Sequence, residues 1–162
     1  MTQTDIKMGC DLHSIVQVHR NNAWESIDLN FIDWRSYRIY AFLAGVRNNY
    51  AIEPIFEPRG VPFGISQELT EHFTNNEGFF HTFTWFSLKE LCDFNYDQLM
   101  EDRRTMINGD GGCTAPIGQG HRQTHKKFLG PNYFKDLGGI VSVTEEMGVP
   151  KEDVRIIIYF DN

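Results

Sequence analysis

Apolar and polar residues alternate near the start of the chain, as they do in half-buried strands. Residues 12–18 and 23–29 are two such runs, and Arg20-Asn21-Asn22 between them has the chemistry of a tight turn. This pattern predicts a β-hairpin. Residues 154–160 form a nearly continuous apolar run, which predicts a last strand inside a sheet, beside the first strand.

Helical spacing and helix caps occupy much of the sequence between these strands. Asp33, Ser66 and Ser87 each precede a helical pattern, and Ser87 with Glu90 forms a capping box. Pro131 suits the first turn of a further helix, which Gly138-Gly139 could interrupt. The helices predicted in this way span residues 34–46, 67–72, 88–92, 97–104 and 131–147.

Two stretches have no regular pattern. Prolines and a glycine exclude a regular helix over residues 48–63, and five glycines fall within residues 109–120. We therefore expect a flexible loop over residues 105–128 and an amino-terminal extension over residues 1–7. The whole order predicts one α+β domain, residues 1–162, in which a small, mainly antiparallel sheet with an N-terminal hairpin and a C-terminal strand is packed by three to five helices.

Composition narrows the class of protein. The 162 residues are 41% hydrophobic and include 13 phenylalanines, which indicates a globular chain. A net charge of −7 argues against binding duplex DNA. Three scattered cysteines support neither a disulfide framework nor a zinc site, and no apolar run is long enough to span a membrane. We expect a cytoplasmic protein that needs no metal or cofactor and has no membrane partner.

The polar residues of the two terminal strands are the first candidates for chemistry. Side chains repeat every two residues along a strand. Asp11 and His13 therefore share one face of the first strand, and Arg155, Tyr159 and Asp161 share one face of the last strand. Cys10 points the other way and is expected in the core. Asp11 could orient or charge His13, and the last strand could hold phosphate, ribose and base edges. Internal salt bridges within the sheet explain the same residues equally well.

Five further candidates lie between the terminal strands. His81 precedes a capped helix and could face a cleft lined by Trp85, or simply pack among aromatic rings. Arg59 lies between two prolines, which could present its guanidinium to an anion or to Glu57 or Glu53. Arg38 and Arg47, on or just after the first helix, complete the candidate ligand-binding set.

Familiar enzyme signatures are absent from the sequence. The glycine-rich stretch around Gly111 lacks the Lys-Ser/Thr of a phosphate-binding loop, and no zinc-protease, nucleophile-elbow, dinucleotide-binding or EF-hand motif occurs. The basic residues between 121 and 127 are expected to be a solvated surface.

Several stretches together resemble a family of small phage and prophage proteins. They are Met8-Gly9-Cys10-Asp11-Leu12-His13 and residues 37–48, 57–62, 81–91 and 154–162. The chain departs from that pattern in the seven residues before Met8 and in Thr-Phe-Thr after His81, where the family has a serine-rich run. The resemblance implies a phage-encoded protein of the host cytoplasm and supplies no established reaction.

Three hypotheses about function follow. The first is a phage accessory protein that sequesters a small anionic nucleotide-type ligand, such as a host immune signal, without turning it over; a homo-oligomer with pockets between subunits fits this class. The second is a hydrolase or transferase that uses Asp11, His13, His81 and Asp161 in acid-base or metal chemistry on a similar ligand. The third is a protein that inhibits a host factor by binding it.

Overall fold

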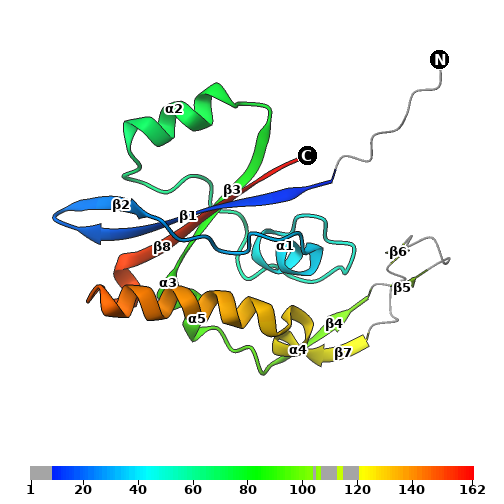
Figure 1. Cartoon of the computed structure of the whole chain (residues 1–162). Coiled ribbons are helices and arrows are strands. Elements are labelled where there is room, and N and C mark those ends of the chain that lie inside the picture. Colours follow the sequence, from blue (N-terminus) through cyan, green and yellow to red (C-terminus); the bar gives the residue numbers. More distant parts are fainter. Residues whose placement is uncertain (1–8, 104, 107–112, 115–120) are drawn as a thin grey trace, which may run out of the picture.

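A four-stranded antiparallel sheet organises the protein (Figure 1). The structure is a computed structural model that describes residues 9–103, 105–106, 113–114 and 121–162. The strand order is β2-β1-β8-β3, with β1 at Asp11–Arg20, β2 at Ala23–Ile27, β3 at Phe80–Ser87 and β8 at Val154–Asp161. The predicted α+β fold, its hairpin and the pairing of the first with the last strand are confirmed.

The hairpin turn follows from its two asparagines. Asn21 and Asn22 have φ angles of 53° and 60°, and Arg20 pairs with Ala23 across the turn. A two-residue hairpin of this kind needs the left-handed region at both positions, which asparagine tolerates better than most residues. The turn therefore fixes the register of β1 against β2.

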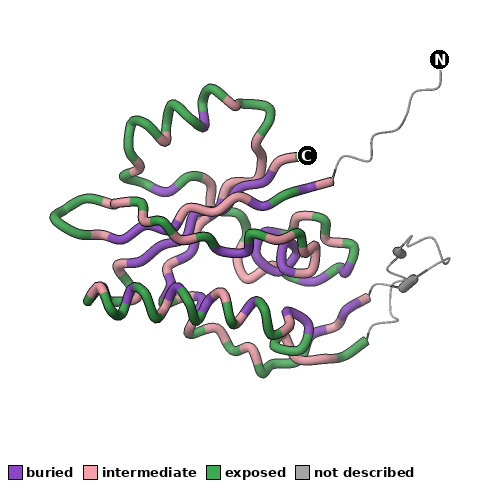
Figure 2. Tube along the Cα trace, viewed as in Figure 1, coloured by how far each residue is buried: buried purple, intermediate pink, exposed green. Residues whose placement is uncertain are grey.

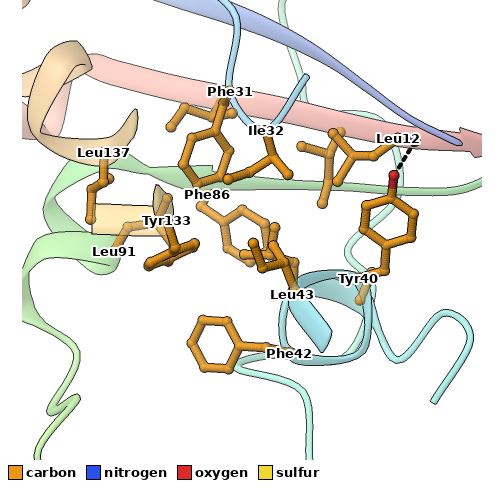
Figure 3. Packing of buried hydrophobic residues seen from close by; sticks show 14 of the residues in the cluster. Leu12, Phe31, Ile32, Tyr40, Phe42, Leu43, Phe86, Leu91, Tyr133 and Leu137 are labelled. Atoms are coloured by element: carbon orange, nitrogen blue, oxygen red, sulfur yellow. Dashed lines mark hydrogen bonds between the residues drawn. The ribbon is translucent and has the colours of Figure 1, made fainter. Parts of the chain in front are cut away.

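One face of the sheet, which we call the core face, lies against most of the helices. These are α1 at Tyr37–Ala44, α3 at Leu88–Asp93, α4 at His125–Leu129 and α5 at Pro131–Glu146. Figure 3 shows the aromatic and aliphatic side chains between them, and the Tyr40 hydroxyl accepts a hydrogen bond from the Leu12 amide at 3.2 Å. Cys10 is fully buried here, as its alternation predicted.

The opposite face, which we call the outer face, carries the polar residues of β1 and β8. Helix α2 at Gln67–Asn75 lies on this side, across the strands from α5 (Figure 1). Figure 2 shows α2 mostly exposed, and Phe73 is its one buried residue. Its ring packs against Phe83 and Tyr159 at centroid distances of 4.9 and 5.1 Å. A short helix and one phenylalanine therefore cover this end of the outer face.

Two of the sequence expectations are wrong. The helix expected over residues 97–104 is instead strand β4, Leu99–Asp102, paired with β7, His121–Thr124. Burial alternates along β4, with Met100 and Asp102 inside, so tertiary pairing overrides the helix-forming composition. The loop expected over residues 105–128 therefore ends earlier, because β7 and α4 occupy residues 121–128. Short strands β5, Thr105–Met106, and β6, Cys113–Thr114, also pair, while residues 107–112 and 115–120 lie outside the described residues.

The remaining helices differ from expectation only at their ends. Helix α1 begins after Ser36 rather than at Trp34, and α2 continues to Asn75 from its Ser66 cap. The capping box of Ser87 and Glu90 is present at α3. Helix α5 runs without interruption through Gly138-Gly139, and a single 3-10 turn, Lys151–Asp153, leads into β8.

Candidate functional site

A bulge in β3 decides which of its side chains reach the outer face. Phe80 pairs with Asp161 and His81 with Phe160, whereas the next pair is Thr84 with Ile158. Three steps on β3 therefore match two on β8, which is the mark of one extra residue, and Thr82 there has a φ of 54°. The bulge places Phe80 and Trp85 on the outer face, and His81 on the core face.

His13 and Asp161 form a pair on the outer face. Asp11 lies opposite Asp161 and His13 opposite Tyr159 in the antiparallel register, so the contact runs diagonally across two strands. His13 Nε2 lies 2.5 Å from Asp161 Oδ2, and the side chains are 40% and 18% exposed. The imidazole also stacks on Tyr159 at 5.2 Å and meets the Phe80 ring at 5.5 Å. These contacts hold the His13 ring while leaving part of it open to solvent.

Asp11 has a different partner from the one expected. Its carboxylate accepts from Arg35 Nε at 3.0 Å and Nη2 at 2.9 Å, and both side chains are about half exposed. Asp161, not Asp11, therefore holds His13. Sequence reasoning missed Arg35, because it precedes α1 in a segment without regular structure and carries no motif.

Aromatic rings surround the buried side of the His13–Asp161 pair. Tyr159 contacts Phe80 at 4.8 Å and Phe83 at 5.4 Å, and burial raises the pKa of Tyr159. A cavity of about 260 Å³ opens beside them. We call His13, Phe80, Tyr159, Asp161, Asp11 and Arg35 the strand-end cluster. Phe80 belongs both to this cluster and to the cavity wall.

Arg155 lies further along the same face of β8 and is only 4% exposed. It donates from Nε to Gln17 Oε1 at 2.8 Å and from Nη1 to the Phe63 carbonyl at 2.7 Å, and its guanidinium lies 4.0 Å from the Trp24 ring centroid. Nη2 is buried without a hydrogen-bond partner, and burial lowers the pKa of Arg155 to about 10. Among the described residues, no carboxylate pairs with this guanidinium.

Arg59 and Trp85 form a separate, neutralised group. Arg59 donates to both oxygens of Glu90, from Nη1 at 2.8 Å and Nη2 at 2.9 Å, and lies 4.9 Å from the Trp85 ring centroid. These hydrogen bonds hold the pKa of Glu90 below its usual value. The salt bridge expected as an alternative for Arg59 is present, with Glu90 in place of Glu57 or Glu53.

The other three sequence candidates also lie apart from the His13–Asp161 pair. His81 stacks on Phe160 at 6.0 Å on the core face, so the expected cleft with Trp85 and the four-residue set with Asp11, His13 and Asp161 do not form. Arg38 lies over Phe128. Arg47 lies over Tyr37 and reaches Asn162 Oδ1 at 3.4 Å, beside the end of β8.

Larger cavities do not involve the predicted residues of the outer face. One of about 590 Å³ is lined by residues of the 51–55 segment, β4 and the start of α4. Within the described part of the chain, no group of three or more metal-ligating side chains is arranged to hold an ion. A search of the same residues finds no helix with the length and apolar character needed to cross a membrane.

Comparison of the chain with family models, with curated proteins and with solved structures finds no match. The strand-end cluster offers a carboxylate-bound imidazole, an arginine and several aromatic faces. That composition suits a ligand with hydroxyls, an anionic group and a planar ring.

Proposed function

We propose that the protein binds and sequesters a small anionic nucleotide-type ligand at the strand-end cluster. The observation that carries this proposal is the position of Phe80. Its ring meets His13 at 5.5 Å and also forms a wall of the 260 Å³ cavity. We place a single ligand across the Phe80 ring, where it would contact the polar pair and fill the cavity.

The register suggests how such a ligand would lie. Asp11, Asp161 and Phe80 are neighbours across three strands, which spans roughly 10 Å at the usual strand spacing. A planar base would enter the cavity beyond Phe80, with ribose hydroxyls on Asp161 and His13. The anionic group would then lie near Arg35.

The biological setting belongs to the same proposal. A phage protein of the host cytoplasm that sequesters a nucleotide-derived immune signal would protect the phage without catalysis. A homo-oligomer that places the cavity between subunits is part of this class. Light scattering measures the number of subunits in solution.

Binding is tested by titration calorimetry against cyclic dinucleotides, ADP-ribose derivatives and nucleoside monophosphates. His13→Gln should weaken binding at least tenfold, because its ring contacts both Asp161 and Phe80. His19→Gln is the matched control, since His19 lies on the same face of β1, six residues away, against Trp24. No binding across the panel, or equal loss in both variants, contradicts the proposal.

The 2.5 Å contact between His13 and Asp161 favours a second candidate, a hydrolase or transferase in which Asp161 orients His13 as general acid or base. Mass spectrometry after incubation separates the two functions. Sequestration leaves the bound ligand intact and recoverable. Products that form with the wild type and not with Asp161→Asn establish catalysis instead.

A further inference from the structure

The cavity beside Phe80 is walled by aromatic rings and has one acidic side chain. Its lining residues are Val61, Phe73, Thr74, Glu77, Gly78, Phe80 and Phe83. About 260 Å³ is below the range usual for whole drug-sized ligands, so the cavity accommodates one planar ring system. It is the part of the proposed ligand site that can distinguish one base from another.

Glu77 is the charged group available in this cavity. Its backbone is fixed, because its amide donates to the Thr74 carbonyl at 3.2 Å and the residue forms a bridge with Phe80. Its side chain is exposed and makes no hydrogen bond or ion pair with another described residue. The Thr74 hydroxyl already donates to the Thr70 carbonyl at 2.8 Å. Glu77 is thus a cavity-lining residue whose carboxylate has no partner among the described residues and can act as a strong acceptor.

A carboxylate in this position accepts two parallel hydrogen bonds and donates none. Guanine presents two adjacent donors on one edge, the ring N1–H and the exocyclic amino group. Adenine and cytosine present an amino group beside a ring nitrogen that is itself an acceptor, and this nitrogen is repelled by a carboxylate. The edge of uracil, which is rich in acceptors, is still less suited to a carboxylate.

We infer that this cavity, whose walls include the rings of Phe80 and Phe83, selects a guanine-type base through Glu77. The inference rests on the proposed function and names its ligand class: a guanine nucleotide or guanine-containing cyclic dinucleotide. Charge-assisted hydrogen bonds are about twice as strong as neutral ones, so the preference should be large.

The test is titration calorimetry at low ionic strength with pairs that differ only in the base, GMP with AMP and cyclic di-GMP with cyclic di-AMP. The wild type should bind the guanine member at least tenfold more tightly, and IMP, which keeps N1–H and lacks the amino group, should fall between GMP and AMP. Glu77→Gln should reduce the preference to threefold or less. Glu68→Gln, another exposed acid on the same side of the sheet, should leave the preference unchanged.

The possible results distinguish failure of the base selectivity from failure of the proposed function. Equal binding of the two bases, weakened for both by His13→Gln, overturns the guanine selectivity and leaves the proposed function standing. A preference that survives Glu77→Gln overturns the role of Glu77. Absence of binding by any nucleotide overturns both proposals. An unchanged unfolding midpoint in Glu77→Gln, expected for an exposed residue, shows that a lost preference is not a loss of fold.

Discussion

The two ends of β8 present charged groups on the same face in opposite circumstances. At one end Asp161 is paired with His13, partly exposed and bordered by a cavity. At the other end Arg155 is almost fully buried, with no carboxylate partner among the described residues. Asp161 and Arg155 are only a few residues apart on one strand. The segments that cover each end of the strand therefore cause the difference in their exposure.

Coverage by α2 and by the 57–66 segment explains these environments. The Phe63 carbonyl accepts from Arg155, and Trp24 lies over the guanidinium, so that end is closed. Helix α2 touches the other end through Phe73 and through His72, whose ring lies 5.5 Å from Phe80, and His13 stays 40% exposed. An open, paired end suits ligand exchange, whereas burial of a charge without a counter-charge costs stability.

The largest effect is expected from removing the side chain by which α2 covers the open end. Phe73→Ala should lower the free energy of unfolding by about 3 kcal/mol, because a buried aromatic ring that packs on Phe83 and Tyr159 is lost. Denaturant titration measures this change. Phe79→Ala, which removes a ring that is 58% exposed, is the control and should cost under about 0.5 kcal/mol. Equal losses would mean that α2 is held by other contacts.

The closed end is tested by replacing the buried charge together with Gln17, its side-chain acceptor. Arg155→Met with Gln17→Leu should raise the free energy of unfolding by about 2 kcal/mol, since apolar residues replace an unneutralised charge in a buried position. The double change is needed because Arg155→Met alone leaves Gln17 Oε1 without its donor. A fall in stability would show that the hydrogen bond to the Phe63 carbonyl and the contact with Trp24 outweigh the cost of burying the charge.

Arg59 differs from Arg155 because a carboxylate neutralises it. The pairing of Arg59 with Glu90 leads to a prediction of pH-dependent stability. The pKa of Glu90 lies below its usual 4.5 because Arg59 donates to it. The contribution of Glu90 to the free energy of unfolding is therefore complete above that value and is lost as pH falls through the lower folded-state pKa. Glu90→Gln should therefore cost about 1 kcal/mol at pH 7, after allowance for partial exposure, and progressively less below pH 4.5.

Urea titrations at pH 7, 5 and 3.5 measure the difference between wild type and Glu90→Gln. Asp93→Asn, which removes an exposed partner of Lys89 in the same helix, is the control for general charge effects. A difference that stays constant down to pH 3.5 would contradict the role of the Arg59 contact.

The smallest effect is expected for the pair at the open end. A double-mutant cycle of His13→Gln and Asp161→Asn should give a coupling energy of about 0.5 kcal/mol, because His13 is 40% exposed and solvent weakens the interaction. Thermal unfolding of the four proteins measures it. Coupling above about 2 kcal/mol would place the pair in a far less solvated environment than its exposure indicates.

These contrasts also explain how much the sequence could predict. Alternation along residues 12–18 predicted the first strand of the hairpin and the buried Cys10, because side-chain period is a local property of a strand. The apolar run over residues 154–160 predicted that the last strand lies inside the sheet, beside the first strand. Helix caps at Ser66 and Ser87 were equally local and are confirmed.

The rest depended on register and on contacts distant in sequence. The partner of His13 is Asp161 rather than Asp11, which only the alignment of β1 with β8 decides. The pairing of Arg59 with Glu90 likewise depends on the tertiary structure, because the two residues are 31 positions apart. Local composition favoured a helix over residues 97–104, whereas pairing with β7 produces a strand.

The bulge between His81 and Thr84 has a consequence for how this surface could change during evolution. The extra residue is accommodated between His81 and Thr84, and the pairs on both sides of it are regular. Deleting one residue there would leave Phe80 opposite Asp161 and His81 opposite Phe160, because two steps on β3 would then match two steps on β8. Descendants could therefore gain or lose a residue at this point while Phe80 stays on the outer face and His81 on the core face.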